Sequence, residues 1–262
     1  MRCRVTFYFS IYHIVMFIEE KKINELIKIS HSAGKEILRI YNTKITKKIK
    51  KDRSPVTNAD IAANKIICRE IRKLYPEIPI ISEESKKIDL RKRKTFWLID
   101  PLDGTKEFLK RNGEFTVNIA LISNKKPIFG IIYMPINSII YFTKNKKSYS
   151  GKLKSNGILS KIKLIKTKKR KRNVMVVSRS HNLKKSEIKK KKLAFLNKFN
   201  SNKLIQSGSS IKFCLIASGV ANIYPRYGTT MGMGYSGRDA ILRNAGGRVV
   251  NLDRRTIKYG KK

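Results

Sequence analysis

The chain has 262 residues, of which 41% are hydrophobic, enough for a sizeable core in one large domain or two small ones. Its 60 Lys and Arg residues face only 18 Asp and Glu, which gives a formal net charge of +42 at pH 7 and indicates non-specific contact with polyanions. The basic residues are spread along the whole chain, and no RNA- or DNA-binding motif accompanies them. The composition therefore argues against a dedicated nucleic-acid partner.

The cysteines Cys3, Cys68 and Cys214 lie far apart and lack the paired spacing of a disulfide framework or a zinc site. This pattern is typical of a protein in a reducing cytoplasm. It also gives no indication of nucleophilic catalysis by a thiol.

Residues 1–15 form an N-terminal extension whose apolar run superficially resembles a signal peptide. The run lacks a small-residue cleavage site and is shorter than the ~20 residues that a membrane-spanning helix needs. It is either an extension of little consequence or an interfacial membrane anchor. Because anionic leaflets attract Lys and Arg, we expect a cytoplasmic protein with peripheral contact at the inner face of the cell membrane.

Two helices are predicted near the start of the chain. Apolar residues from 19 to 41 recur at helical spacing, which predicts an amphipathic helix with one core-facing stripe. In the Ser-Pro-Val-Thr-Asn-Ala-Asp run at 54–60, Thr57 and Asp60 have the spacing of a capping box, which predicts that a second helix begins there. Asp60 either serves only as a cap or also contributes a carboxylate to a metal site.

Strand-like runs follow these helices. A short apolar strand from 78 ends in two adjacent acids, Glu83 and Glu84, and a basic loop leads to a strand around Trp97. Three further runs, at 115–123, 127–134 and 139–143, are separated by short turns, which is typical of an antiparallel meander.

The stretch Trp-Leu-Ile-Asp-Pro-Leu-Asp-Gly-Thr at 97–105 delivers two carboxylates, Asp100 and Asp103, from a strand onto a predicted turn. Pro101 fixes one backbone angle and Gly104 permits an unusual one. Such a turn aims both acids and an intervening carbonyl at one point, and Mg²⁺ takes oxygen ligands of this kind. Taken alone, the pattern also fits a solvated turn after a strand.

The rhythm of the sequence changes in its second half. Between Lys144 and Arg172 the chain is rich in Lys, Ser, Gly and Asn; we predict a domain boundary near the end of this stretch and a solvated linker at 166–172. Beyond it, strands and helices alternate, which is typical of an α/β unit. The predicted strands are 174–177, 203–206, 220–224 and 248–251, and the predicted helices are 183–199, 209–218 and 236–245. The domains are then 16–172, an α+β metal-binding domain, and 173–262, an α/β domain.

Taken together, Asp60, Glu83, Asp100 and Asp103 make the sequence resemble the inositol monophosphatase-like superfamily of metal-dependent phosphatases. The sequence looks most like the bacterial 3'(2'),5'-bisphosphate nucleotidases of the CysQ type. The motifs behind this resemblance are Ser-Pro-Val-Thr-Asn-Ala-Asp at 54–60, Ser-Glu-Glu at 82–84, Asp-Pro-Leu-Asp-Gly-Thr-Lys-Glu-Phe at 100–108, Asn-Gly-Glu-Phe-Thr-Val-Asn at 112–118, Val-Ser-Arg-Ser-His at 177–181, Gly-Ser-Ser at 208–210 and Tyr-Pro-Arg at 224–226.

The resemblance implies a fold and a chemistry. The fold is a layered αβαβα sandwich, an α+β half joined to an α/β half with the active site between them. The substrate is adenosine 3',5'-bisphosphate, hydrolysed to AMP and phosphate with Mg²⁺ as cofactor, a by-product clearance step in sulfate assimilation. The alternatives are an inositol monophosphatase and a catalytically weak phosphonucleotide-binding protein.

The resemblance also assigns roles to single residues. Glu83, Asp100, the main-chain carbonyl of Leu102 and Asp103 are implied to hold Mg²⁺, and Glu83 and Thr105, with Asp103, to act in catalysis. The implied substrate-binding residues are Glu83, Leu102, Asp103, Gly104, Thr105, Gly208, Ser209 and Lys212. For the last three, backbone N–H groups at a helix start and a Lys side chain suit a dianionic phosphate.

One position departs from the family pattern. Where the family places a Trp-Asp pair whose Asp binds the second metal ion, this chain has Met233 and Gly234, and Arg238 replaces a small residue. Asp239, more than a helical turn further on, faces another direction and does not replace the missing acid. Three interpretations follow: an enzyme impaired by the missing ligand at Gly234, activity that survives on the other ligands, and a protein retained only for binding or structure.

Overall fold

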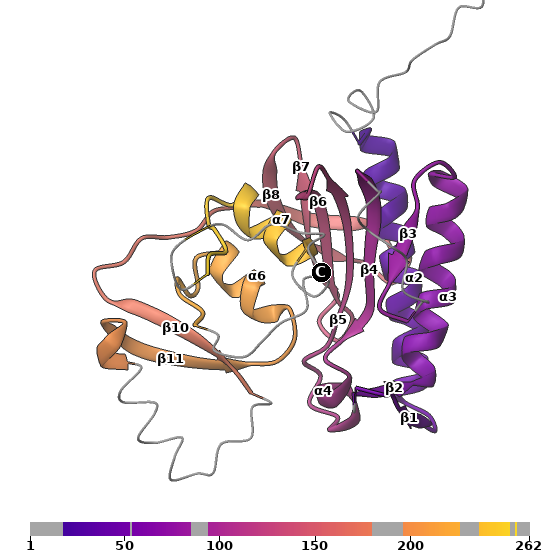
Figure 1. The fold of residues 1–262 in the computed structure, drawn as a ribbon, viewed down its shortest axis with the longest axis horizontal. Coiled ribbons are helices and arrows are strands. Elements are labelled where there is room, and N and C mark those ends of the chain that lie inside the picture. The colour runs from indigo at the N-terminus through magenta and orange to yellow at the C-terminus, as the bar shows by residue number, and fades with distance from the viewer. Residues whose placement is uncertain are drawn as a thin grey trace, which may run out of the picture.

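The computed structural model describes residues 18–52, 54–84, 94–179, 196–225, 236–251 and 255. These form successive layers, with helices α2 and α3 on one face of a large sheet and helices α6 and α7 on its other face (Figure 1). A two-stranded sheet, β10 and β11, lies beyond α6. The order α, β, α, β agrees with the predicted αβαβα sandwich. Most of the helix predicted at 183–199 falls outside the described residues.

The bounds of the helices agree closely with the sequence patterns. Thr57 caps α3 by accepting from the backbone N–H groups of Ala59 and Asp60, and the Asp60 carboxylate accepts from the Thr57 N–H, which completes the predicted capping box. The described helices are α2 (Glu20–Tyr41), α3 (Asn58–Leu74), α4 (Thr105–Leu109), α6 (Ile211–Ala217) and α7 (Ser236–Asn244).

Within the described residues, the large sheet has seven strands in sequence order, and only its first pair, β3 and β4, is parallel. Its strands are β3 (Ile80–Ser82), β4 (Thr95–Asp103), β5 (Thr116–Ser123), β6 (Lys126–Met134), β7 (Ile139–Lys144), β8 (Lys147–Leu153) and β9 (Leu159–Ile165). Two smaller sheets are the antiparallel pair β1 (Lys47–Ile49) with β2 (Pro55–Thr57) and the parallel pair β10 (Asn173–Ser178) with β11 (Ser201–Ser207).

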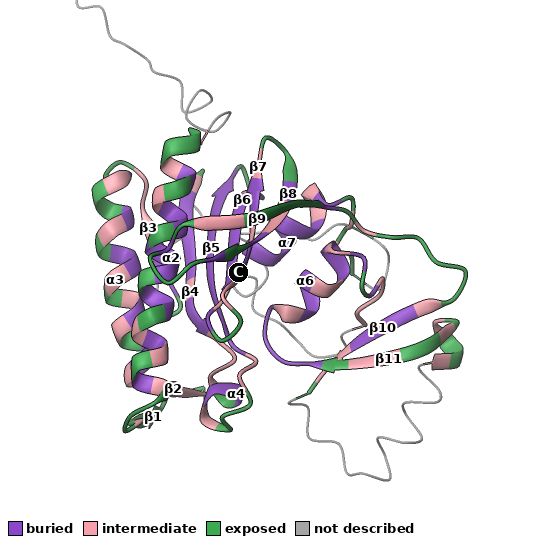
Figure 2. Ribbon diagram, turned by 180° about the vertical axis from the view of Figure 1, so that it is seen from behind, coloured by how far each residue is buried: buried purple, intermediate pink, exposed green. Residues whose placement is uncertain are grey.

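The large sheet is buried on both faces, as the purple central strands in Figure 2 show. Because side chains alternate along a strand, Trp97 of β4 packs with α2 and α3, whereas Leu98 joins the cluster around Phe213 of α6 and Ile241 of α7. The segment after 172 therefore shares a core with the large sheet.

Two predictions from the second half need correction. Residues 147–165, for which the sequence patterns predicted no strand, contribute β8 and β9 to the large sheet; β9 is largely exposed, so its Lys and Ser residues hide the strand in the sequence. Residues 166–172 are mostly exposed coil, as predicted. The predicted strand at 220–224 is reduced to an isolated bridge between Met175 and Ile223, and no strand is seen at 248–251.

Candidate active site

The acids of the 97–105 stretch lie in a β-bulge. Strand β4 does not end before Asp100 but continues to Asp103, so the predicted turn is wrong. Asp100 pairs with Asn118 and Asp103 pairs with Thr116, so three steps along β4 match two steps along β5. Residues three apart normally face opposite sides of a sheet, but one extra residue restores the alternation. The bulge therefore turns both carboxylates to the same side.

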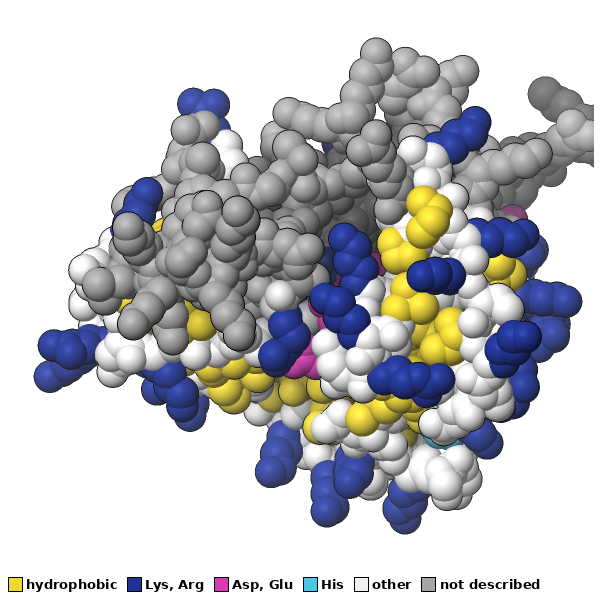
Figure 3. Space-filling view, turned by 90° about the horizontal axis from the view of Figure 1, so that it is seen from below, with side chains coloured by type: hydrophobic (Ala, Val, Ile, Leu, Met, Phe, Trp, Pro, Cys, Tyr) yellow, Lys and Arg dark blue, Asp and Glu magenta, His cyan; other side chains and the backbone are white. Residues whose placement is uncertain are grey.

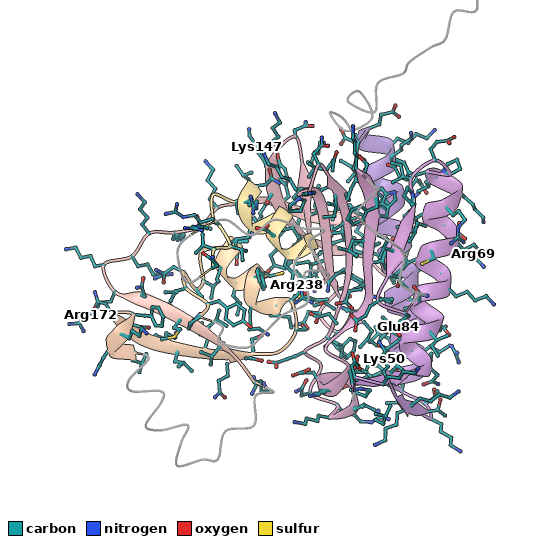
Figure 4. The ribbon with its side chains drawn as sticks, viewed as in Figure 1. Lys50, Arg69, Glu84, Lys147, Arg172 and Arg238 are labelled. Carbon is teal, nitrogen blue, oxygen red and sulfur yellow. The ribbon has the colours of Figure 1, made fainter. Side chains whose placement is uncertain are left out.

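A single nitrogen of Arg238 joins these two carboxylates. Its Nη2 atom lies 3.2 Å from Asp100 Oδ2 and 2.8 Å from Asp103 Oδ1, and only 9% of the Arg238 side chain is exposed. Figure 4 shows Arg238 in the centre of the molecule, between the helices α6 and α7 and the large sheet. The Asp100–Asp103 pair thus presents its oxygens to one positive centre, the Arg238 guanidinium, and its role as a metal site stays a prediction.

Glu83 follows β3 beside this pair. Its backbone N–H donates to the carbonyl of Ile99, so the parallel ladder carries Glu83 alongside the end of β4. Lys50 approaches from the β1–β2 hairpin, with its Nζ 3.5 Å from Glu83 and 2.7 Å from Glu84 (Figure 4). Nothing in the sequence pattern pointed to Lys50, because its partners are more than thirty residues away along the chain.

The crowding of acids changes their proton affinity. Burial raises the pKa of Asp100 well above its ordinary value, and the carboxylates of Glu83 and Asp103 raise it further, whereas the Arg238 guanidinium opposes the rise. Loss of hydration also raises the pKa of Glu83; Lys50 opposes this, and the charge on Asp103 adds to it. Burial and the neighbouring acids thus disfavour the charged forms of Asp100 and Glu83, and a cation bound beside them would favour those forms.

Asp60 and Thr105 form the next part of the site. The Thr105 hydroxyl lies 3.1 Å from Asp60 Oδ1 and 3.3 Å from the Leu102 carbonyl oxygen, and both are acceptors. Asp60 is therefore more than a helix cap. It is almost fully buried, and burial raises its pKa although hydrogen bonds from Thr57 and Thr105 counteract the rise.

Gly104 permits this geometry because its φ of 98° lies in the left-handed region that favours glycine. A Cβ atom at this position would also lie 2.9 Å from the Glu114 carbonyl oxygen. The bulge, Gly104 and the start of α4 together place Thr105 next to Leu102 and Asp60.

The predicted phosphate-binding segment at 208–212 lies next to the acid pair, but its polar groups make contacts within the protein. The Gly208 N–H donates to Glu114 Oε2 at 2.8 Å, and the buried Lys212 ammonium donates to the carbonyls of Ser207 and Ser209. Ser209 has a positive φ of 41°. These bonds hold the loop in shape, and the substrate contacts assigned to Gly208, Ser209 and Lys212 stay predictions.

Ser210 is a site residue that was not among the predicted ones. Its hydroxyl is fully buried and donates to Asp103 Oδ2 at 2.7 Å, which fixes the second carboxylate from the side opposite Arg238. The Gly-Ser-Ser motif was the only signal for it, and the motif did not distinguish the two serines.

Gly234 and His181 lie outside the described residues. Asp239 does not join the acid pair, as predicted, because its carboxylate binds Arg243 at 2.8 Å on the same helix. Among the residues that the structure describes, no three Asp, Glu, His or Cys side chains converge closely enough to hold one metal ion. Mg²⁺ does not require such a group, since it is commonly held by one or two carboxylates, a few waters and substrate phosphates.

The residues present fit Mg²⁺. Hard carboxylate oxygens from Glu83, Asp100 and Asp103, with the Leu102 carbonyl between the last two, are the donors that this ion prefers. The positive nitrogen that already contacts both Asp100 and Asp103 stands where a cation is attracted. In the space-filling view, acidic side chains are visible in a hollow with Lys and Arg side chains along its sides (Figure 3).

The layered sandwich carries its acid cluster at the bulge in β4, the strand next to the sheet edge β3. Residues 19–262 match the model of the inositol monophosphatase family, and the chain belongs to that family.

Comparison with individual proteins of the family shows which of its members the chain is similar to. The chain is 40% identical over 243 residues, 91% of its length and 88% of the relative's, to the 3'(2'),5'-bisphosphate nucleotidase CysQ of Buchnera aphidicola subsp. Acyrthosiphon pisum (strain APS). It is 37% identical to the Escherichia coli (strain K12) protein of the same name, over 90% of this chain and 93% of that protein. The crystal structure of CysQ from Bacteroides thetaiotaomicron matches with a TM-score of 0.75 and 34% identity, over 94% of both chains.

Proposed function

We propose that the protein is a Mg²⁺-dependent phosphomonoesterase that hydrolyses adenosine 3',5'-bisphosphate to AMP and phosphate, a by-product clearance step in sulfate assimilation. The proposal rests on one observation, the acid pair beside Glu83 and Thr105. Asp100 and Asp103 both contact a single positive centre, the Nη2 atom of Arg238. The names of the nucleotidase relatives support the choice of substrate.

Mg²⁺ would be held by Glu83, Asp100, the Leu102 carbonyl and Asp103. When bound, it supplies positive charge that acidifies the attacking water and offsets the charge of the phosphate ester. Glu83, at the open side of the cluster with 48% of its side chain exposed, is placed to accept a proton from that water.

Thr105 positions the same water. Because its hydroxyl proton is directed to Asp60 or to the Leu102 carbonyl, the lone pairs of its oxygen stay available as acceptors. A water that donates to Thr105 and to Glu83 is held with its own lone pair free to attack phosphorus. Asp60 is then a positioning residue that acts through Thr105.

The site belongs to a protein that we place in the cytoplasm, where the buried free thiols of Cys68 and Cys214 remain reduced. Within the described part of the chain, no helix is both long and apolar enough to span a bilayer. Peripheral contact with an anionic membrane stays a prediction.

Phosphate release from adenosine 3',5'-bisphosphate and from inositol 1-phosphate, measured side by side while Mg²⁺ is titrated, tests the proposal. We expect the nucleotide to be the better substrate, and chelation of Mg²⁺ or Asp103→Asn to abolish release. Asp52→Asn, which removes an exposed acid, is the matched control and should leave release unchanged.

Three results would contradict parts of the proposal. Preference for the inositol ester would make the protein an inositol monophosphatase, and activity in Asp103→Asn would contradict the assignment of the site. Tight nucleotide binding without turnover would favour the catalytically weak binding protein, an alternative that the loss of an acid at Gly234 keeps open.

A further inference from the structure

We propose that Arg238 is a built-in cation that takes the place of one of the two metal ions implied at this site, so that the protein binds a single Mg²⁺ before substrate arrives. The inference rests on the proposed function, because it concerns the metal centre of the same site. It assigns a role to a residue that stands where the family pattern has a small one.

The geometry of the ion pairs is the first argument. One atom, Nη2, contacts both carboxylates at 2.8 and 3.2 Å, rather than two nitrogens contacting one carboxylate as in a common Arg–Asp pair. A divalent ion shared by Asp100 and Asp103 would have to lie between the same two oxygens. The guanidinium and the ion therefore exclude each other by volume and by charge.

The second argument is that the position of Arg238 is fixed. Helix α7 packs directly on the sheet at Gly130 of β6, where an added Cβ atom would lie 2.6 Å from the Gly237 carbonyl oxygen. Arg238 follows Gly237 in the first turn of this helix, and its side chain is 9% exposed. A long buried side chain that begins at a clamped backbone and ends on two carboxylates has little freedom to leave them.

The third argument is charge compensation. Gly234, four residues before Arg238 in the sequence, has no side-chain oxygen to offer a metal ion. An Asp with a divalent ion carries one net positive charge, which is what a guanidinium alone carries. Loss of the acid at 234 together with gain of Arg238 therefore keeps the charge opposite Asp100 and Asp103 unchanged. Of the four ligands proposed above, Asp103 would then pair with Arg238, and Glu83, Asp100 and the Leu102 carbonyl would hold the one remaining ion.

The test counts metal ions on the full-length protein without substrate. Mn²⁺, which takes the same oxygen ligands as Mg²⁺, is titrated, and the free ion is measured by its electron paramagnetic resonance signal. We expect about one tightly bound ion in the wild type and about two in the double variant Gly234→Asp/Arg238→Gly, in which the carboxylate is restored and the guanidinium removed. Arg39→Ala, which removes an exposed Arg from helix α2, is the matched charge control and should still bind about one ion.

Two tightly bound ions in the wild type would overturn the inference, and so would a folded double variant that still binds one. Circular dichroism establishes whether the variants fold. Should the double variant not fold, Arg238→Lys decides instead: it keeps the positive charge and should bind one ion, and a second ion there would contradict the inference.

The ion count is independent of the reaction. A wild type that binds one ion but releases no phosphate would leave the inference standing while the proposed function fails. Conversely, an active enzyme with two ions would sink the inference alone.

Discussion

Thr105 has a hydrogen-bonding arrangement that a structural residue would not need. Its hydroxyl faces two acceptors, Asp60 at 3.1 Å and the Leu102 carbonyl at 3.3 Å, and it lies directly after the bulge that carries the acids. We predict that Thr105→Ala lowers kcat by about 100-fold with little change in KM, because misplacement of a reacting group by about 1 Å costs on this scale. Thr105→Ser retains the hydroxyl and should lose less than about tenfold.

Steady-state phosphate release at saturating Mg²⁺ measures both variants, with thermal unfolding as the control for folding. A merely structural role would affect kcat only in proportion to the stability that Thr105→Ala loses. Equal activity of the Ala and Ser variants would therefore contradict the assignment of Thr105 as a water-positioning residue.

At the residue scale, the sequence predicted the acids and missed their partners. Asp60, Asp100 and Asp103 each stand next to recognisable Thr, Pro or Gly residues in the sequence. A local pattern is therefore enough to find them. Lys50 and Ser210 reach the site through contacts that span 34 and 107 positions, and no local pattern encodes such pairs.

At the element scale, two features position the residues of the site. They are the bulge in β4 and the packing of α7 on β6. Two acids three residues apart, with Pro101 and Gly104 beside them, predicted a turn. The same residues also fit a bulge within the sheet, and the sequence does not distinguish the two. The structure shows a bulge, since Asp103 still pairs with Thr116 of β5. Strands β8 and β9 were missed for a related reason, since half-exposed antiparallel strands carry polar residues.

The contact of α7 with β6 yields a prediction with an internal control. A Cβ atom at Gly130 would lie 2.6 Å from the Gly237 carbonyl oxygen and 3.0 Å from the Ala240 Cβ, so Gly130→Ala must push α7 away from the sheet. Overpacking of this kind costs about 1–3 kcal/mol of the free energy of unfolding. Because Arg238 sits on α7, the same shift should weaken its hold on Asp100 and Asp103.

Gly237→Ala is the control, because its added Cβ atom would make only an ordinary contact of 3.4 Å with the Ile119 carbonyl oxygen. Denaturant unfolding of both variants measures the difference. Equal stability of Gly130→Ala and Gly237→Ala would show that α7 is not clamped on the sheet as described.

At the scale of the whole molecule, the excess of positive charge surrounds a small concentration of negative charge. The chain carries 60 Lys and Arg, yet its few acids include a cluster in which the pKa values of Glu83 and Asp100 are raised. Composition predicted contact with anions and could not reveal this local reversal of sign. On the proposed function, a cationic exterior would attract a bisphosphate by long-range steering, and the anionic centre would bind the metal that the proposed reaction needs.

The acid cluster also affects how stability depends on pH. Acidification adds positive charge to a chain that is already basic, but it relieves the burial of negative charge at the cluster. A carboxyl group whose pKa is raised on folding binds its proton more tightly in the folded state than in the unfolded state. It adds stability below its unfolded pKa, and this contribution is lost as pH rises through the folded pKa. For Asp100 in the metal-free protein, burial raises the pKa of the carboxyl group, so its charged form is disfavoured in the folded state and this penalty is relieved as the pH falls.

We predict that Asp100→Asn raises the unfolding temperature of the metal-free protein and that this gain is smaller at pH about 5.5 than at pH about 7.5, because acidification favours the protonated form of the wild-type carboxyl group, whose pKa is raised. Thermal unfolding in chelator at both pH values measures the difference in unfolding temperature, and comparison with wild type removes the general effect of added positive charge at low pH.

Asp52→Asn is the control with the opposite sign, because hydrogen bonds from Ser54 lower the pKa of Asp52 in the folded state. Saturating Mg²⁺ should abolish the advantage of Asp100→Asn, since the ion stabilises the charged carboxylate that the variant lacks. A metal-free Asp100→Asn protein that is less stable than wild type at both pH values would show that the Arg238 ion pair outweighs the burial of this charge.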